Sequence, residues 1–349
     1  MVRSPKSLRP YPARVAVLAL LLAAVLGSVA CGVSAGTGAR GASPAATPTT
    51  PASPAQAASP APAAPVAEAV PPHHGSRTIA FAKGSVGGPE GNTIRGYGIH
   101  VVRTDGSGLR RVTASGTHPA WSPDGERLAY CEWMDGIWVV GADGSGDHAV
   151  THTRFSSGVD WSPDGTQLVF AGSDPPGRSR LYVVNVDGTG RRPLVDGGPG
   201  TEDRFPVWAA DGRIYFLRGY DSYRNAIVAV DPDGGDQEVV TAVRVTVGFS
   251  VSPDGMWLVF CDAGDLVCVA ASGLGAQIVV VSKAEVDNGR LSAGVYGPSS
   301  WSSDGRMIAF GFGSGPWAWP GPIHVVRSDG WSVREVPRVI GWDPAVRPE

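Results

Sequence analysis

The chain has 349 residues and a formal net charge of −3, so it lacks the positive excess that nucleic-acid binding needs. We therefore expect no nucleic-acid partner. Residues 76–349 contain no P-loop, no His-Glu-x-x-His helix, no Cys-x-x-Cys pair and no Gly-x-Ser-x-Gly elbow. The sequence thus predicts no metal, no cofactor and no catalytic residue that a motif would identify.

The first 31 residues are predicted to be a signal peptide that ends in a lipobox. Basic side chains from Arg3 to Arg14 precede an apolar run over residues 15–30, which is shorter than the ~20 residues of a membrane span. Small residues come directly before Cys31, and this pattern predicts a lipid on its thiol and cleavage before it. An ordinary secreted protein cleaved nearby and an uncleaved anchor are the alternatives. All three predict an exported domain.

Residues 32–75 are predicted to be a disordered linker. They consist almost wholly of Ala, Pro, Ser, Thr and Gly, a composition that cannot form an apolar core. Pro-rich stretches act as stiff spacers, and Gly/Ser-rich stretches act as flexible coils. We expect this tether to hold the domain of residues 76–349 away from the membrane.

A turn of the type Trp-Ser-Pro-Asp-Gly recurs along residues 76–349, and each copy leads into an apolar triplet. The copies begin at Trp121, Trp161, Trp208, Val251 and Trp301, and the fragment Trp342-Asp343-Pro344 is aligned as a sixth. They lie 40 to 50 residues apart, close to the ~40–45 residues of a four-stranded propeller blade. Pro, Asp and Gly favour the tight turn of a hairpin, and the apolar triplets are typical of short strands.

The second half of each repeat, an apolar strand that leads to a turn, recurs as well. Ile99–Val102 is the first of six apolar strands and Ile323–Val326 is the last, and five of the six lead to an Asp-Gly turn. Because the first unit begins at Thr78 without a Trp strand before it, we expect the C-terminal segment around Trp342 to supply its innermost strand. Such closure removes exposed sheet edges. The prediction for residues 76–349 is an all-β, six-bladed propeller of four-stranded antiparallel blades, closed by the C-terminal strand.

These residues resemble the TolB-like, WD-like propeller repeat. Its pattern is Trp-Ser-Pro-Asp-Gly, an Ile-Ala-Phe-like strand, an Ile-Tyr-Val-like strand and then Asp-Gly. The resemblance covers about residues 76–349. It implies the propeller fold, and it implies a function only weakly because that fold hosts many functions. The member that gives the family its name has an extra N-terminal domain that binds a lipoprotein partner, and this chain has the predicted linker in that place.

The loops at the two ends of the predicted propeller differ in character. Those at one end are short and repetitive, whereas those at the other are long and dissimilar, and variable loops on a rigid scaffold usually carry binding. Tyr, Trp and Arg are enriched at binding hot spots. The candidate binding residues at this end, around the mouth of the central channel, are Tyr220, Tyr223, Trp317, Trp319, Arg204, Arg218, Arg224 and His118. The alternative is that these tryptophans pack over a blade edge, the arginines are solvated and His118 is structural.

Two cysteines flank a predicted turn within one blade. A two-residue turn would pair Cys261 with Leu266 and place Cys268 diagonally on the same face. A disulfide between Cys261 and Cys268 is one interpretation in an exported protein. The other is a pair of small buried apolar side chains.

The sequence predicts a binding or scaffold module at the cell envelope. We expect a monomer that is extracytoplasmic, tethered to the membrane through Cys31 or else secreted, with an envelope protein, a peptidoglycan-related ligand or a saccharide as its partner. The alternative is an enzyme of the lyase, glycosidase or lactonase type. Its dispersed site at the channel mouth would draw on Asp160, Glu202, Asp203 and His118.

Overall fold

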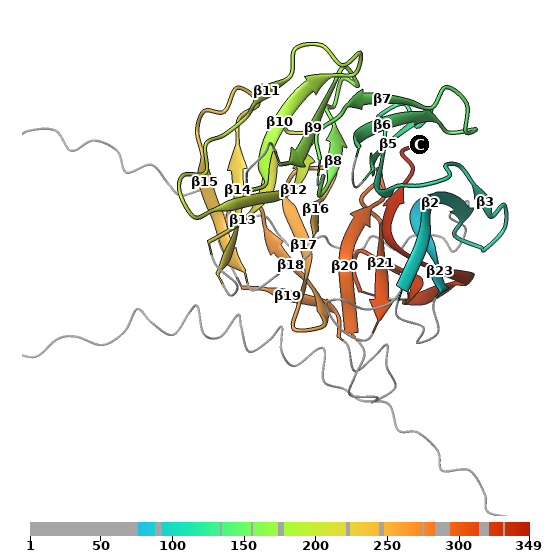
Figure 1. The fold of residues 1–349 in the computed structure, drawn as a ribbon. Helices are drawn as coiled ribbons and strands as arrows, with labels where there is room; N and C mark the ends of the chain where they lie inside the picture. Colours follow the sequence, from blue (N-terminus) through green and yellow to red (C-terminus); the bar gives the residue numbers. More distant parts are fainter. Residues whose placement is uncertain are drawn as a thin grey trace, which may run out of the picture. The chain divides into compact units, whose positions relative to one another are not determined.

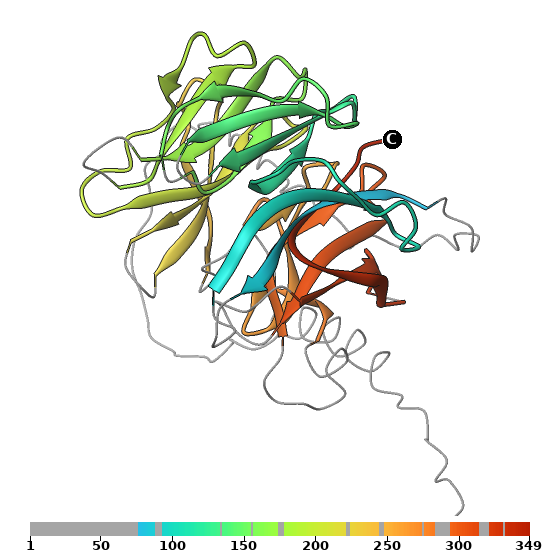
Figure 2. The ribbon, with the colours of Figure 1, turned by 45° about the vertical axis from the view of Figure 1, so that its right-hand side comes forward.

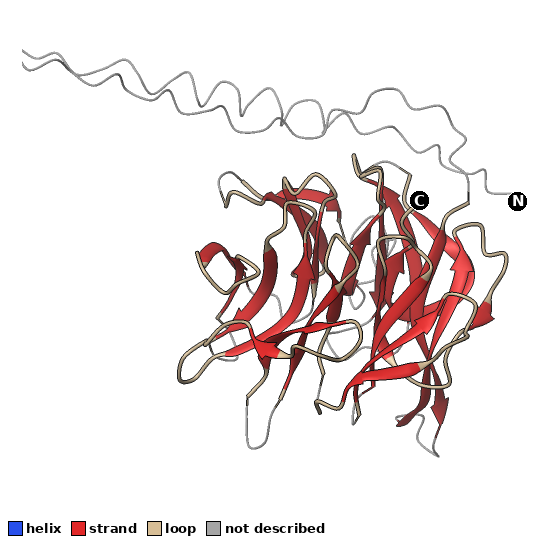
Figure 3. Cartoon of the chain, turned by 90° about the horizontal axis from the view of Figure 1, so that it is seen from above, coloured by secondary structure: helices blue, strands red, loops and turns tan. Residues whose placement is uncertain are grey.

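The computed structural model describes most of the chain from residue 76 onward. The described ranges are 76–87, 93–132, 135–154, 156–173, 178–220, 224–243, 248–273, 276–282, 294–313, 321–330 and 332–349. The chain divides into two compact units, Met1–Ala58 and Ser59–Glu349, and every described residue belongs to the second. Cys31 and the predicted linker lie outside the described residues. The regular elements in these ranges are all β-strands (Figure 3), and no helix there is long and apolar enough to cross a membrane.

Within the described ranges, four antiparallel sheets contain four strands each, and in each sheet the strands lie in chain order (Figure 1). One comprises β4 (Thr117–Trp121), β5 (Arg127–Glu132), β6 (Gly136–Gly141) and β7 (His148–Thr151). The next comprises β8 (Val159–Trp161), β9 (Gln167–Gly172), β10 (Arg180–Asn185) and β11 (Arg192–Pro193). Then come β12 (Glu202–Trp208), β13 (Ile214–Gly219), β14 (Asn225–Val230) and β15 (Glu238–Val243). The last comprises β16 (Phe249–Val251), β17 (Trp257–Asp262), β18 (Asp265–Ala270) and β19 (Ile278–Val281).

A fifth, seven-stranded sheet joins the two ends of this domain (Figure 2). Its strands, in spatial order, are β20 (Gly294–Trp301), β21 (Met307–Gly313), β22 (Gly321–Arg327), β23 (Arg334–Val346), β1 (Thr78–Gly87), β2 (Thr93–Arg103) and β3 (Arg110–Arg111). The arrangement is therefore all-β and propeller-like, as the repeat predicts.

Strand β23 is shared between the two halves of the seven-stranded sheet. Its first section pairs with β22, with Arg334 opposite Val325. Its last section pairs with β1, with Val346 opposite Ile79. The C-terminal segment thus lies beside the strand that begins at Thr78, as the missing Trp strand there predicts.

The alignment of Trp342 with the other turn tryptophans is wrong. Trp121 lies opposite Leu128 of the next strand, and the residue that lies opposite the corresponding Ile79 is Val346. The structural equivalent of Trp121 is therefore Val346. The Trp-Asp-Pro letters resemble the turn motif, but strand pairing places them four residues too early.

The repeated turn is held by one local set of hydrogen bonds. The hydroxyl of Ser162 donates to Asp164 Oδ1 at 2.6 Å and accepts the backbone N–H of Gln167 at 2.9 Å. The same hydroxyl-to-amide bond, also 2.9 Å, recurs at the equivalent serines: Ser122, Ser252 and Ser302. Gly165 has φ of 69°, a conformation that favours glycine. The motif residues are thus explained by local turn chemistry.

The core consists of aromatic side chains at the end of each apolar triplet. The fully buried members are Phe81, Phe170, Phe216, Phe260 and Phe310, and Tyr130 holds the same place in β5. They pack with aliphatic side chains of adjacent strands, in clusters that span neighbouring sheets. This packing fixes the sheets around the innermost strands, which form the site described next.

Candidate functional site

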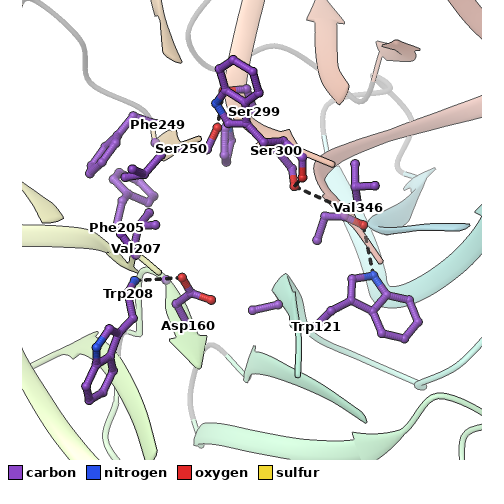
Figure 4. Close-up of a pocket in the computed structure, with 18 of the residues that line it drawn as sticks. Trp121, Asp160, Phe205, Val207, Trp208, Phe249, Ser250, Ser299, Ser300 and Val346 are labelled. Carbon is purple, nitrogen blue, oxygen red and sulfur yellow. Dashed lines mark hydrogen bonds between the residues drawn. The ribbon is translucent and has the colours of Figure 1, made fainter. Parts of the chain in front are cut away.

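A cavity of about 320 Å³ lies among the innermost strands (Figure 4). Residues from β4, β8, β12, β16, β20 and β23 line it, so each four-stranded sheet contributes one strand and the seven-stranded sheet contributes two. His118 and Asp343 line the end at which these strands begin, which is the end that carries the long variable loops. The predicted channel mouth and this end of the cavity therefore coincide.

Three side chains at this end sit on an unusual backbone. His118, Phe205 and Asp343 each lie three residues before the tryptophan position of their strand, and their φ values are 51°, 51° and 52°. The strand register shifts beside each of them, as at a β-bulge. A positive φ costs a non-glycine residue about 1–3 kcal/mol, and residues strained in this way cluster at active sites and ligand sites. The fold thus holds three strained side chains at one end of the cavity.

His118 and Asp343 form a polar contact across the closing junction of β4 and β23. The distance from His118 Nε2 to Asp343 Oδ2 is 3.6 Å, and His118 Nδ1 lies 3.0 Å from Thr117 Oγ1. The Asp343 side chain is 9% exposed, and burial raises the pKa of its carboxyl, although the His118 charge and backbone amide lower it. The His118 and Phe205 rings lie 5.7 Å apart.

Asp160 lines the cavity from β8 and ties two sheets together. Its carboxyl accepts the backbone N–H groups of Trp161 and Trp208, each at 2.9 Å. Burial raises the pKa of Asp160 to about 7, and these two amide bonds oppose the rise. Ser300 ties β20 to the last section of β23 in a similar way, because its hydroxyl accepts the N–H of Val346 at 3.0 Å. Figure 4 shows both bonds across the cavity.

Two of the predicted binding arginines form ion pairs with carboxylates of β12, and their binding role stays a prediction. Arg218 holds the fully buried Asp203 with two bonds, Nε to Oδ1 at 2.8 Å and Nη2 to Oδ2 at 3.0 Å. Asp203 and Arg218 are also directly opposite each other in the β12–β13 register. Arg204 forms a long ion pair of 3.7 Å with Glu202. Neither arginine lines the cavity.

The other predicted residues are divided between the described and the undescribed segments of the chain. His118 lines the cavity, and Tyr220 is 41% exposed in the loop after β13. The backbone N–H of Tyr220 bonds to the carbonyl of Arg224 at 2.9 Å, which closes that loop. Tyr223, Trp317 and Trp319 lie outside the described residues, so their binding role stays a prediction.

The four residues suggested for a dispersed catalytic site are not gathered at the cavity. His118 and Asp160 line it, whereas Glu202 and Asp203 belong to the arginine pairs of β12 and β13. No group of three or more His, Cys, Asp and Glu side chains in the described residues is placed to hold a metal ion.

Sequence reasoning missed Asp343 and Phe205 as site residues. The letters around Asp343 resemble a turn motif, and Phe205 looks like an ordinary strand residue. The signal that could have found them is their spacing, three residues before Val346 and Trp208, which matches that of His118 before Trp121.

Cys261 and Cys268 occupy the predicted positions on β17 and β18. Cys261 lies opposite Leu266, and Cys268 lies opposite Val259, so the two cysteines are diagonal neighbours. The structure records both as thiols, and burial raises the pKa of Cys261 to about 11 and that of Cys268 to about 12. Their disulfide stays a prediction for the oxidised protein.

Comparison with known proteins gives one family and several partial relatives. The model of the TolB beta propeller domain matches residues 97–289, more than half of the chain. The uncharacterized peptidase YuxL of Bacillus subtilis is 26% identical over 206 residues, which are 56% of this chain and 29% of that protein. Dipeptidyl-peptidase 5 of Porphyromonas endodontalis is 36% identical over 110 residues, 30% of this chain and 16% of that protein. The chain thus spans less than a third of these two relatives.

Among solved structures, the crystal structure of TolB from Acinetobacter baumannii superposes with a TM-score of 0.61. The match covers 78% of this chain and 67% of that chain, at 18% sequence identity. At that identity the likeness establishes the fold alone.

Proposed function

The chain belongs to the TolB beta propeller domain family, and from that premise we propose that it is a binding module at the cell envelope, exported and held to the membrane by a lipid on Cys31. Its partner is an envelope protein, a peptidoglycan-related ligand or a saccharide. The leader and the lipobox-like residues before Cys31 support the location.

One observation carries the binding role. Three strained side chains, His118, Phe205 and Asp343, surround one end of a cavity to which every sheet contributes. Strain of this kind persists only where the surrounding structure imposes it. Concave, largely apolar sites with a few convergent polar groups are the usual form of a ligand site.

We also infer that the propeller has six blades. Strand β23 divides the seven-stranded sheet into two halves: β20–β22 with the first section of β23, and the last section of β23 with β1–β3. Added to the four separate sheets, these two halves make six units of four strands. The division rests on the pairing of Arg334 with β22 and of Val346 with β1.

The enzyme alternative ranks second. Asp160 already uses its carboxyl on two backbone amides, and Asp203 uses its carboxyl on Arg218. A lyase, glycosidase or lactonase site would have to rely on His118 and Asp343. The peptidase names of two relatives belong to proteins of which this chain spans only a small fraction.

The test is site-specific photo-crosslinking in the envelope of intact cells, with the full-length protein. A photoreactive side chain replaces Tyr220, at the end of the propeller that carries the cavity mouth. The matched control replaces Leu109, equally exposed at 41% but located in the β2–β3 turn at the other end. A defined adduct from position 220 and none from position 109 supports the proposal. Adducts from both positions, or from neither, contradict a partner at this face.

A further inference from the structure

We propose that the central cavity binds a small organic cation, with an ammonium group beside Asp343 and an apolar body along the cavity wall. This inference rests on the proposed function as a binding module and names the ligand class of the same site. It identifies the ligand by charge and shape, independently of any protein partner.

The charge of the lining favours a cation over an anion. Two carboxyl groups, Asp160 and Asp343, line the cavity, and His118 is the one basic side chain among the described lining residues. Lys and Arg are missing from this lining on β4, β8, β12, β16, β20 and β23. A phosphate or carboxylate would find no fixed positive partner there, whereas an ammonium would find the carboxyl of Asp343, since that of Asp160 already accepts two backbone N–H groups.

Asp343 offers the specific contact. Its Oδ2 is buried without a hydrogen-bond partner among the described residues, and its side chain is 9% exposed. His118 Nε2 lies 3.6 Å from this oxygen, which is longer than a normal hydrogen bond, and the backbone N–H of His118 is the other donor beside the carboxyl. A buried acceptor left without a donor costs free energy, and an N–H group of a ligand would remove that cost.

The wall provides the place for the apolar body of the ligand. Phe205, Val207 and Phe249 lie together on one side of the cavity (Figure 4). The Phe205 ring lies 5.7 Å from the ring of His118, the residue that contacts Asp343, and it offers an aromatic surface to a cation at this end of the cavity. A volume of about 320 Å³ is at the lower end of the ~300–1,000 Å³ of small-molecule sites, so it has room for the apolar body of a small organic cation.

Binding of such a cation releases protons. Burial raises the pKa of both Asp160 and Asp343, so each carboxyl holds its proton more tightly than a free aspartate does. The titratable groups that face Asp343 are His118 on β4 and the buried Cys131 on β5, whose thiol pKa of about 12 keeps it neutral. An incoming ammonium favours the carboxylate form, and its affinity therefore rises with pH until both acids are ionised.

The experiment compares three probes of similar size on the full-length protein. They are n-butylammonium, 1-butanol and butyrate, measured by ligand-observed NMR and by calorimetry at pH 6 in two buffers of different ionisation enthalpy. We expect n-butylammonium to bind with proton release, 1-butanol to bind at least about tenfold more weakly, and butyrate not to bind, because a charged hydrogen bond is lost in each replacement.

The matched variants are Asp343→Asn and Asp236→Asn. Asp236 is an exposed aspartate that also has a positive φ, of 43°, but it lies away from the cavity. Asp343→Asn should weaken n-butylammonium binding at least about tenfold, and Asp236→Asn should leave it unchanged. If Asp343→Asn does not fold, the comparison of the three probes on the wild-type chain still tests whether the cavity binds a cation.

Equal binding of 1-butanol and n-butylammonium would overturn the proposal, as would binding of butyrate or an unchanged affinity in folded Asp343→Asn. These outcomes are separate from those of the crosslinking test. A specific adduct at position 220 without cation binding would contradict only the proposed ligand class, and the proposed binding role at the envelope would stand. Cation binding without an adduct would contradict the proposed envelope partner, and the proposed ligand site in the cavity would stand.

Discussion

The indole of Trp121 donates from Nε1 to the backbone carbonyl of Ala345 at 3.1 Å, across 224 positions of sequence. Trp161 makes the same bond, also 3.1 Å, to the carbonyl of Ala120 on the neighbouring strand β4. The closing junction of the propeller therefore uses the same tryptophan contact as a junction between sheets that follow one another in the chain.

Trp121→Phe keeps the ring but removes the donor, and we expect it to lower the free energy of unfolding by about 1 kcal/mol. Trp301→Phe is the matched control, because the Nε1 of Trp301 has no hydrogen-bond partner among the described residues. Urea unfolding of the full-length protein measures both. An equal loss in the two variants would show that the bond from Trp121 to Ala345 contributes nothing.

Asp160 should make the protein less stable as the pH rises. Its folded pKa of about 7 is above the usual value of 3.8, so the native state binds the proton more tightly than the unfolded chain does. Stability therefore falls between about pH 4 and pH 7, by at most roughly 4 kcal/mol, and is constant above that range. Asp343 contributes in the same direction, since burial raises its pKa as well.

The measurement is the free energy of unfolding of the wild type and of Asp160→Asn from pH 4 to pH 8. Near pH 4 the protonated Asp160, like asparagine, has one carbonyl acceptor for the two amides of Trp161 and Trp208, so the two proteins should be similarly stable there, and the slope of the variant with pH should be smaller. Parallel pH profiles for the two proteins would contradict a raised pKa at Asp160.

Arg218 should prove structural when it is replaced. Arg218→Ala leaves the carboxylate of Asp203 buried without its partner, and we expect a loss of about 3–5 kcal/mol in stability. The double variant Asp203→Asn with Arg218→Met removes both charges and should recover some of that loss. Thermal unfolding checks both. Unchanged stability together with weaker partner crosslinking would restore the binding role predicted for Arg218.

Cys31→Ala should release the protein from the membrane, because the lipid that holds it is predicted on that thiol. Incorporation of a labelled fatty acid and fractionation of cells check this prediction, and Cys131→Ala is the control, since Cys131 is buried in the folded domain. Label in the Cys31→Ala protein, or an unchanged membrane fraction, would contradict lipidation.

The repeat predicts the sheets well because its chemistry is local. The turn formed by Ser162, Asp164 and Gly165 spans only a few residues, so the residue types alone indicate where the strands end. The same reasoning failed at Trp342, because the true equivalent, Val346, lacks the tryptophan and is defined only by pairing with Ile79 far away in sequence.

The site was harder to predict than the fold for a related reason. The pairing of Arg218 with Asp203 depends on the register between two strands, and the contact of His118 with Asp343 depends on which strand closes the propeller. Neither relationship is visible in residue types. The positive φ of Phe205 is equally hidden, because phenylalanine does not favour that conformation.

The division of β23 between two partner strands sets an order of events in folding. Residues 342–346 complete the sheet that starts at Thr78, so the first-made strands remain an open edge until nearly the whole domain has emerged. Contacts this distant in sequence form slowly. During synthesis the early strands are therefore exposed to mispairing with other chains, and pairing of residues 342–346 with β1 ends that exposure.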